Sequence, residues 1–171
     1  DISRIERGKF KIVSQPVKLP ELFDFYCQAI AGMAETKNIR FSGKLHNISH
    51  NVLLSDQIRL GQIYMNLLSN AVKYTPENGD VKFEVYEEKL AESGKVRLVS
   101  VVSDTGIGMS EAFQKHIYES FSRAENSVTN KVQGTGLGMA ITKNIVDMMG
   151  GVITLQSQLG KGTRFEVVLD F

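Results

Sequence analysis

The sequence predicts an α/β sandwich in which helices pack on a largely antiparallel sheet. Three observations support this fold class: helical and strand-like segments are mixed along the chain, four of the strand-like segments form two adjacent hairpins, and 171 residues suit one globular domain. Hairpins pair neighbouring strands antiparallel. They therefore favour this arrangement over a doubly wound parallel sheet.

The N-terminal half of the chain is predicted to hold one long helix among short strands. Residues 20–36 place apolar side chains at helical spacing. Before them, Pro16 closes a strand, and Gly8 is a typical helix stop. In chain order the predicted elements are a helix tail, a strand, the long helix, and two short strands or a strand and a connector: residues 1–8, 10–17, 20–36, 39–45 and 51–55.

The C-terminal half is predicted to hold a second long helix and two hairpins. Asp56 caps the helix, which runs to about Thr75 and stops at Pro76. Turn residues around Gly94 and Gly160 join alternating apolar strands in the two hairpins. The hairpin strands are residues 81–90 with 96–104, and 152–158 with 162–171. Between the hairpins we expect a short helix, a polar mobile loop and a helix that Gly150 ends: residues 110–119, 122–134 and 137–149.

Composition and charge narrow the classes of partner. The chain has 20 basic and 19 acidic residues, so no excess of charge indicates nucleic acid or an anionic membrane as the main partner. With 42% hydrophobic residues, the sequence is typical of a folded domain with its own core. The single cysteine, Cys27, can form neither an internal disulfide nor a Cys-based zinc site, which indicates a reducing compartment.

The two ends of the sequence are typical of a domain excised from a longer protein. The N-terminus has no initiator Met and is charged from its first residue, so we expect no signal peptide in this segment. The C-terminus stops abruptly at EVVLDF. No apolar run reaches the roughly 20 residues that span a bilayer. This leaves room for a membrane anchor elsewhere in the full protein.

The second long helix carries two asparagines one turn apart, Asn66 and Asn70. On a helical wheel its apolar side chains fall on one arc, and its polar side chains fall on a neighbouring arc with Tyr74 at the edge. A solvated face would explain the polar arc, but asparagine is a weak helix former, and amides with a lysine suit Mg²⁺ and phosphate. The apolar arc is Leu60, Ile63, Tyr64, Leu67, Leu68 and Ala71; the polar arc is Arg59, Gln62, Asn66, Asn70 and Lys73.

An apolar strand runs directly into Asp104, and glycines follow at positions 106 and 108. A carboxylate at the end of a strand can accept a hydrogen bond from an exocyclic amine such as that of adenine. Glycines permit positive φ angles and the close approach of a flat ring to the backbone. The alternative is an ordinary strand-to-turn aspartate followed by two turn glycines.

Residues 133–141 (QGTGLGMAI) carry glycines at alternate positions just before an apolar helix. Free backbone N–H groups and the positive end of a helix dipole form an anion site at such a start. No lysine follows the glycines as in a P-loop, and no strand precedes them as in a dinucleotide fingerprint. A flexible linker that caps a core helix is the alternative.

Together, in this order, the three segments resemble the ATP-binding catalytic domain of bacterial sensor histidine kinases. The superfamily also includes gyrase, MutL-type repair proteins and ninety-kilodalton heat-shock chaperones. NLLSNAVKYTP resembles its N box, SDTGIGM its G1 box, FQKHIYESF its F box and GTGLGMAI its G2 box. GKGTRFEVVL is similar to its final hairpin, and DISRIERGKF to the end of the preceding dimerisation helix.

The resemblance implies a fold and a division of the chain. The fold would be of the Bergerat ATP-binding type, a two-layer α+β sandwich with a mixed, mostly antiparallel five-stranded sheet on three helices. Residues 1–9 would end the preceding dimerisation helix or linker. Residues 10–171 would form the catalytic domain, with an ATP lid at about 122–136.

The resemblance also implies ATP and Mg²⁺ as cofactors and assigns roles to individual residues. Asn70 would coordinate the metal, Asn66 would contact phosphate or metal-bound water, and Lys73 would neutralise phosphate charge. Asp104 would accept from the adenine amine, and Thr163 would support it through a water. Tyr74, Gly106 and Gly108 would line the base pocket, and the triphosphate would be wrapped by Gly134, Thr135, Gly136, Leu137 and Gly138.

The resemblance also suggests roles for residues of the predicted lid and of the F box beside it. Arg123 is the candidate catalytic residue, reaching the γ-phosphate, although an exposed lid charge would equally explain it. Phe113 and Phe121 of the F box are expected to pin the lid into the core rather than touch substrate.

Position 66 separates phosphoryl transfer from hydrolysis within this superfamily. Members that hydrolyse ATP carry a glutamate one turn before the metal asparagine, and here Asn66 cannot act as a general base. Transfer to a protein nucleophile is therefore predicted. His46, His50 and His116 lack the flanking residues of the family's acceptor, so we expect them to be ordinary surface or packing histidines.

The predicted activity is donation of the γ-phosphoryl group of Mg-ATP to a histidine on a separate dimerisation domain, within a two-component system. The implied partners are that domain of the same protein, in a homodimer, and a response regulator or receiver domain. The implied location is a cytoplasmic domain of a bacterial sensor, with or without a membrane anchor. Two alternatives stay open: a regulatory or scaffold module without phosphotransfer, and a serine kinase of the anti-sigma type.

Overall fold

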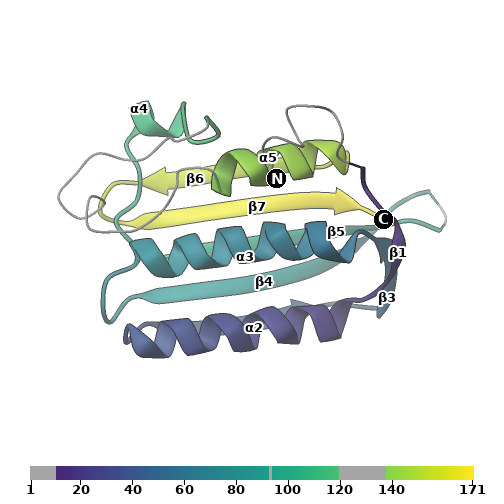
Figure 1. Ribbon diagram of the computed structural model, residues 1–171, viewed down its shortest axis with the longest axis horizontal. Helices are drawn as coiled ribbons and strands as arrows, with labels where there is room; N and C mark the ends of the chain where they lie inside the picture. The colour runs from purple at the N-terminus through teal and green to yellow at the C-terminus, as the bar shows by residue number, and fades with distance from the viewer. Residues whose placement is uncertain (1–10, 93, 120–137) are drawn as a thin grey trace.

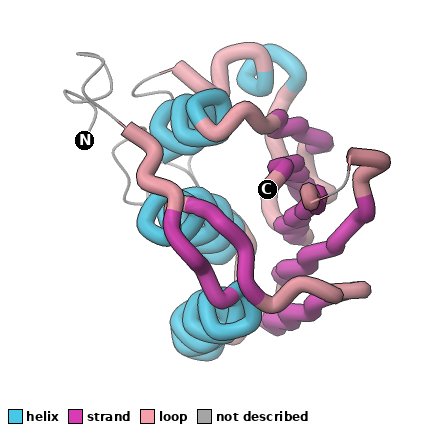
Figure 2. Tube along the Cα trace, turned by 90° about the vertical axis from the view of Figure 1, so that its right-hand side faces the viewer, coloured by secondary structure: helices cyan, strands magenta, loops and turns pink. Residues whose placement is uncertain are grey.

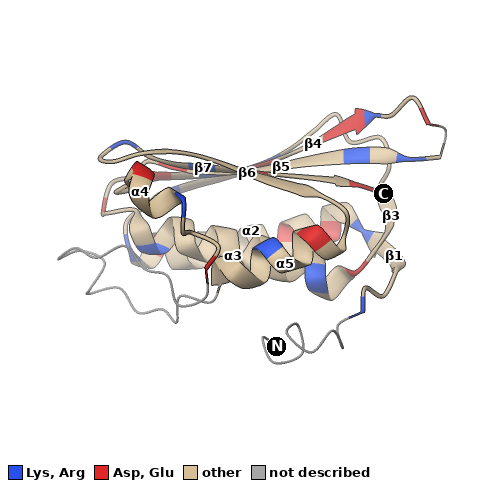
Figure 3. Cartoon of the chain, turned by 90° about the horizontal axis from the view of Figure 1, so that it is seen from above, with Lys and Arg blue, Asp and Glu red and all other residues tan. Residues whose placement is uncertain are grey.

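Three long helices, α2, α3 and α5, cover one face of a five-stranded sheet, and no described element covers the other face (Figure 1, Figure 3). The computed structural model describes residues 11–92, 94–119 and 138–171. Its elements, in chain order, are β1 Gln15–Lys18, α2 Leu19–Thr36, β2 Arg40–His46, β3 Val52–Ser55, α3 Gln57–Tyr74, β4 Asp80–Lys89, β5 Val96–Asp104, α4 Glu111–Gln114, α5 Gly138–Met148, β6 Val152–Gln158 and β7 Gly162–Asp170.

The large sheet has the strand order β2-β4-β5-β7-β6. Only β2 and β4 pair in parallel, because β3 and the helix α3 lie between them in the chain and form a crossover connection. The other three pairs are antiparallel. Strands β1 and β3 form a separate two-stranded antiparallel ribbon that crosses the end of the helix layer (Figure 2). The predicted fold, a mixed and mostly antiparallel five-stranded sheet on three helices, is confirmed.

The central helix α3 forms as its sequence pattern predicts. The Asp56 carboxylate caps it by accepting from the Arg59 N–H at 3.0 Å. All six residues of the predicted apolar arc are buried against the sheet. Among them, Tyr64 is fully buried, its hydroxyl lies 3.0 Å from that of Ser100, and burial raises the pKa of Tyr64 to about 12. The polar arc is therefore left on the side of α3 that faces away from the core.

Two predicted elements are shorter in the structure than expected. The predicted strand 10–17 is β1, which begins only at Gln15 and contains Pro16 instead of ending there. Each strand of a two-stranded ribbon has an unpaired edge, and that is where a proline is tolerated. The predicted helix 110–119 is only α4, because the chain beyond it tightens into i to i+3 turns such as that from the His116 N–H to the Phe113 carbonyl.

Other predicted boundaries hold. Gly150 follows α5 with a φ of 72° and stops it as expected. The predicted polar loop 122–134 and the helix tail 1–8 lie outside the described residues. None of the described helices is long and apolar enough to cross a membrane. Acidic and basic residues are interspersed over the elements in Figure 3.

Candidate functional site

The C-terminal turn of α3 presents two of the predicted phosphate-facing side chains. Asn70 is half-buried and Lys73, one turn on, is exposed. Within the described residues the Asn70 side chain makes no hydrogen bond, so its amide oxygen keeps its lone pairs for a ligand. Lys37 secures this turn by donating from Nζ to the carbonyl oxygens of Val72 at 2.9 Å and Lys73 at 2.7 Å. It thereby satisfies two of the acceptors that the helix end leaves open.

Asn66 links α3 to the start of α5. Its Nδ2 donates to the carbonyl oxygen of Gly138 at 3.3 Å and to Oγ1 of Thr142 at 3.2 Å. The Thr142 hydroxyl in turn donates to the same Gly138 carbonyl at 2.7 Å. The amide helix and the helix that follows the glycine loop are thus held together by side-chain hydrogen bonds. The predicted contact of Asn66 with phosphate or metal-bound water stays a prediction.

Asp104 ends β5 with a carboxylate that is already partly satisfied. Its Oδ1 accepts from the backbone N–H of Gly106 at 2.8 Å, and the backbone N–H of Thr163 also donates to the carboxylate. Burial raises the pKa of the Asp104 carboxyl to about 6, although the two N–H donors act in the opposite direction. The group is therefore an ionised acceptor at neutral pH, and it protonates in mildly acidic solution.

The loop after Asp104 is pressed between α3 and the β6–β7 turn, and its glycines make this possible. A Cβ on Gly106 would lie 2.4 Å from the carbonyl oxygen of Tyr74, which also accepts from the Ile107 N–H at 3.1 Å. Gly108 has a φ of 67°, and a Cβ there would lie 2.0 Å from the Gln158 carbonyl oxygen. The close approach that we expected for a base ring is made, at both positions, by neighbouring backbone.

A junction of hydroxyl groups supports this loop from the β6–β7 hairpin. Oγ of Ser157 lies 2.9 Å from the Met109 nitrogen, 2.9 Å from the Gly162 carbonyl oxygen and 2.9 Å from Oγ1 of Thr163. Gln114 braces the junction by donating from Nε2 to the carbonyl oxygens of Met109 at 2.9 Å and Ser157 at 3.1 Å. The predicted supporting residue Thr163 therefore has its hydroxyl hydrogen-bonded to a serine.

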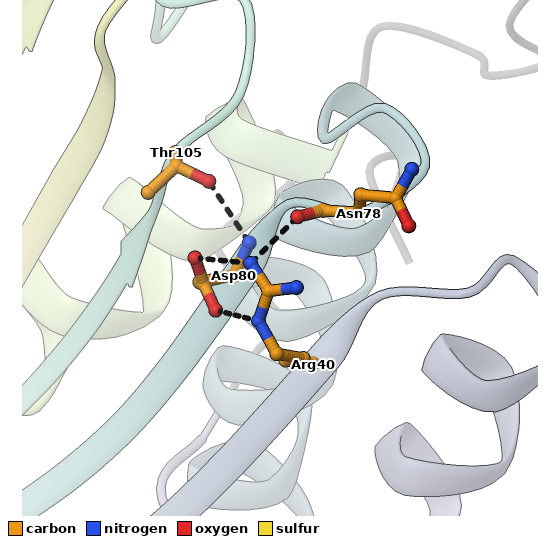
Figure 4. A network of polar contacts seen from close by, with 4 residues as sticks. All are labelled: Arg40, Asn78, Asp80 and Thr105. Atoms are coloured by element: carbon orange, nitrogen blue, oxygen red, sulfur yellow. Dashed lines mark hydrogen bonds and ion pairs between the residues drawn. The ribbon is translucent and has the colours of Figure 1, made fainter.

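A charged network holds the turn between α3 and β4 beside the same loop (Figure 4). The Arg40 guanidinium forms a fork with Asp80, from Nε to Oδ1 at 2.6 Å and from Nη2 to Oδ2 at 3.0 Å. Its Nη2 also donates to the Asn78 carbonyl oxygen at 2.7 Å. The Asp80 backbone N–H donates to Oγ1 of Thr105 at 2.9 Å, and Thr105 directly follows Asp104. The start of β4 is thus tied to the end of β5.

The structure brings the described members of the predicted site together around the C-terminal half of α3, where β5 also ends and β7 begins (Figure 1). The lid residues lie outside the described residues, and so does Phe121. Phe113 packs against the core, as expected. The members brought together are Asn66, Asn70, Lys73, Tyr74, Asp104, Gly106, Gly108, Gly138 and Thr163; those outside are Arg123, Gly134, Thr135, Gly136 and Leu137.

Four residues that support the site were missed from the sequence. Lys37, Arg40, Gln114 and Ser157 each act through contacts with residues far away in the chain. No local pattern marks them, because the register between strands decides which side chains meet. A pairing of strands β5, β6 and β7 was the signal needed to find Ser157.

Ionisation of Asp104 is expected to destabilise the fold between about pH 4 and pH 6. Because its folded pKa of about 6 lies above the ordinary 3.8, the folded chain holds the proton more tightly, and the free energy of unfolding falls as pH rises through this window. In Asp104→Asn this fall should be absent, a difference of at most about 3 kcal/mol by pH 7. Urea unfolding of both proteins from pH 4 to pH 8 measures it, and parallel pH profiles would contradict the expectation.

Comparisons with known proteins identify the family of the chain. A family model described as "Histidine kinase-, DNA gyrase B-, and HSP90-like ATPase" matches residues 55–171. The sensor histidine kinase GacS of Pseudomonas protegens (strain DSM 19095 / LMG 27888 / CFBP 6595 / CHA0) is 35% identical over 170 residues, 99% of this chain and 18% of GacS. The autoinducer 2 sensor kinase/phosphatase LuxQ of Vibrio parahaemolyticus serotype O3:K6 (strain RIMD 2210633) is 36% identical over 170 residues, 99% of this chain and 20% of LuxQ.

A solved structure extends the likeness to three dimensions. Full-length ShkA in complex with AMPPNP superposes with a TM-score of 0.80 at 28% identity, covering 98% of this chain and 33% of ShkA. The chain spans about a fifth of the length of GacS and of LuxQ. The family model covers more than half of the chain, including α3, the Asp104 loop and the final hairpin. The chain belongs to the histidine kinase-, DNA gyrase B- and HSP90-like ATPase family.

Proposed function

We propose that the chain binds Mg-ATP and donates its γ-phosphoryl group to a histidine on a separate dimerisation domain, as the catalytic domain of a sensor histidine kinase. One observation carries the proposal: the backbone of the Asp104 loop packs directly on the end of the amide helix, through Gly106, Ile107 and Tyr74. The Asp104 carboxylate, which suits a base amine, and the polar side chains of α3, which suit phosphates, therefore lie next to each other. The relatives named as sensor kinases support the same activity.

Asp104 is the proposed anchor for the adenine amine. Its carboxylate lies at the end of β5, is shielded enough to raise its pKa, and is oriented by the N–H groups of Gly106 and Thr163. A fixed acceptor in a partly dry site discriminates more strongly between bases than one in water, since an unpaired group there costs more. Tyr74, Gly106 and Gly108 are the proposed walls of this base pocket.

The residues present fit a magnesium ion that is held mainly by phosphate and water. The described residues contain no cluster of three acidic, histidine or cysteine side chains, and the Asn70 amide oxygen has no protein partner among them. Mg²⁺ keeps several waters and takes few protein ligands when it binds with a nucleotide, so one amide oxygen suits it. When bound, the ion would neutralise charge on the phosphates. Asn70 would hold it, and Lys73 would add a positive charge beside it.

Transfer to a protein is proposed rather than hydrolysis because α3 has no base to activate water. Asn66 has an amide, and its nitrogen already donates to Gly138 and Thr142. In the proposed step a histidine nitrogen forms a bond to the γ-phosphorus while the bond to the β,γ-bridging oxygen breaks, and ADP leaves. The chain's part is to bind and orient the donor.

The chain's own histidines are already paired with glutamates. His46 Nε2 lies 2.9 Å from Glu84. His50 Nδ1 lies 2.6 Å from Glu87, and His116 Nδ1 lies 2.7 Å from Glu119, so all three have ordinary structural contacts. The acceptor is therefore proposed to lie on the dimerisation domain of the same protein, in a homodimer. A response regulator or receiver domain is the proposed next acceptor, in the cytoplasm of a bacterium.

The test is phosphotransfer to a supplied acceptor. The chain is incubated with γ-labelled ATP and magnesium, alone and with a separate dimerisation domain that carries its histidine. We expect acid-labile, base-stable label on the supplied domain and none on the chain alone. Asn70→Ala should transfer no label, whereas the same change at Asn51, an exposed asparagine just before β3, should leave transfer like that of the original chain.

Each alternative predicts a different outcome of this experiment. A regulatory or scaffold module would bind ATP and label nothing. A serine kinase of the anti-sigma type would give acid-stable label on a protein substrate. Label on the isolated chain would place the acceptor within it and would contradict the proposal.

A further inference from the structure

We propose that Ser157 determines which base this site accepts, by leaving the hydroxyl of Thr163 able only to accept hydrogen bonds. The inference deepens the proposed function and rests on it, since it concerns the base end of the same nucleotide site. Ser157 is outside every motif that the sequence suggested. Its placement comes from the pairing of three strands.

The three residues concerned form one row across the sheet. Asp104 on β5 pairs with Thr163 on β7, and Thr163 pairs in turn with Ser157 on β6. Directly opposed residues on neighbouring strands share a face of the sheet. The next inward-facing row, with Val102 and Phe165, is buried under the helices, so the Asp104 row lies on the helix-covered face at the end of the sheet.

The contacts of Ser157 determine where both hydroxyl protons lie. Its oxygen is 2.9 Å from the Gly162 carbonyl, which can only accept, so the Ser157 proton must point there. The Met109 N–H donates to the same oxygen at 2.9 Å. For the 2.9 Å contact between the two hydroxyls, the only proton left is that of Thr163. Thr163 therefore donates to Ser157, and its own oxygen has no proton for a ligand.

The base end of the site then presents acceptors from two neighbouring strands. The Asp104 carboxylate accepts, and the Thr163 hydroxyl, with 9% of the residue exposed, can also only accept. An adenine amine offers donors to such a pair, directly or through a water, whereas the oxo group of hypoxanthine offers only another acceptor. When two acceptors face each other, a buried polar group is left without a hydrogen bond, and this costs binding free energy. The row selects a 6-amino base over a 6-oxo base.

Replacing Ser157 with alanine tests this directly. Without the serine oxygen, the Thr163 hydroxyl can rotate and donate to a 6-oxo group. The preference for ATP over inosine triphosphate (ITP), the nucleotide of hypoxanthine, should therefore fall roughly tenfold, which is the value of about one hydrogen bond. Dissociation constants for both nucleotides are measured by calorimetry with magnesium present. If Ser157 had a merely structural role, its loss would weaken the binding of both nucleotides alike and leave the ratio of their dissociation constants unchanged.

Gln114→Ala is the matched control, because it removes two other hydrogen bonds of the same junction and leaves the Ser157 hydroxyl in place. It should leave the ratio unchanged. An unchanged ratio in a folded Ser157→Ala protein, or an equal fall in Gln114→Ala, would overturn the proposal. If Ser157→Ala does not fold, Thr163→Val decides: the ratio should fall through weaker ATP binding, and an unchanged ratio overturns the proposal. If the original chain binds neither nucleotide, the proposed function itself fails.

Discussion

Replacing Asn70 with alanine is expected to remove the magnesium-dependent part of ATP affinity. The Asn70 amide oxygen is the atom that we propose as the protein ligand of the ion, and the described residues offer no acidic, histidine or cysteine cluster in its place. The loss should reach at least the roughly 10- to 100-fold that disturbing a metal site costs. Calorimetric titration with ATP, in magnesium and in EDTA, measures it: the original chain should bind more tightly in magnesium, and the variant should bind equally in both.

Stability separates this effect from a folding defect. Asn70 is half-buried and alanine is the better helix former, so the variant should unfold at the same urea concentration as the original chain or slightly higher. Asn51→Ala makes the same chemical change on an exposed residue before β3 and should keep full magnesium dependence. Unaltered magnesium-dependent affinity in Asn70→Ala would place the metal ligand elsewhere.

Asp104→Asn is expected to lower ATP affinity roughly 10- to 100-fold, with or without magnesium. The ionised carboxylate is the proposed acceptor for the adenine amine, and hydrogen bonds to charged groups are worth about 1.5–3 kcal/mol. An asparagine can still accept from the N–H groups of Gly106 and Thr163, but its NH₂ group then offers a donor where the base also has one. Calorimetry with ATP and with adenosine measures the loss, which should be similar for both because it belongs to the base.

Asp170→Asn is the matched control for this variant. Asp170 lies near the other end of β7, where it forms an ion pair with Arg97 at 2.7 Å. Its replacement should leave nucleotide affinity unchanged. Loss of affinity for the triphosphate but not for adenosine in Asp104→Asn would show that the carboxylate does not contact the base.

The local elements of this protein could be predicted because their signals are periodic and short in range. The apolar arc of α3 recurs at helical spacing, so its burial followed from the sequence. Asp56 stands just before that helix and caps it as its type and position predict. The nucleotide segments were found in the same way, as short motifs in a fixed order along the chain. The matching family model confirms the fold and family that they suggested.

Prediction failed where a local signal competed with a distant partner. Pro16 predicts the end of a strand, yet it lies inside β1 because pairing with β3 leaves one edge of that strand free. For the glycines after Asp104, the role in a base pocket stays a prediction, but no local pattern showed that the carbonyl groups of Tyr74 and Gln158 lie against them in the fold. In each case the partner is at least 30 residues away in the chain.

The sequence by itself determined the helices, the strand pattern and the identity of the nucleotide motifs, since each depends on residues within a few turns of one another. Only the tertiary structure decided that β5, β7 and β6 lie side by side and that Asp104, Thr163 and Ser157 form one row. Strand register comes from the packing of many residues that are far apart in the chain, and a shift of one residue would turn each of these side chains to the opposite face. That long-range register set the direction of a single hydroxyl proton, which no motif records.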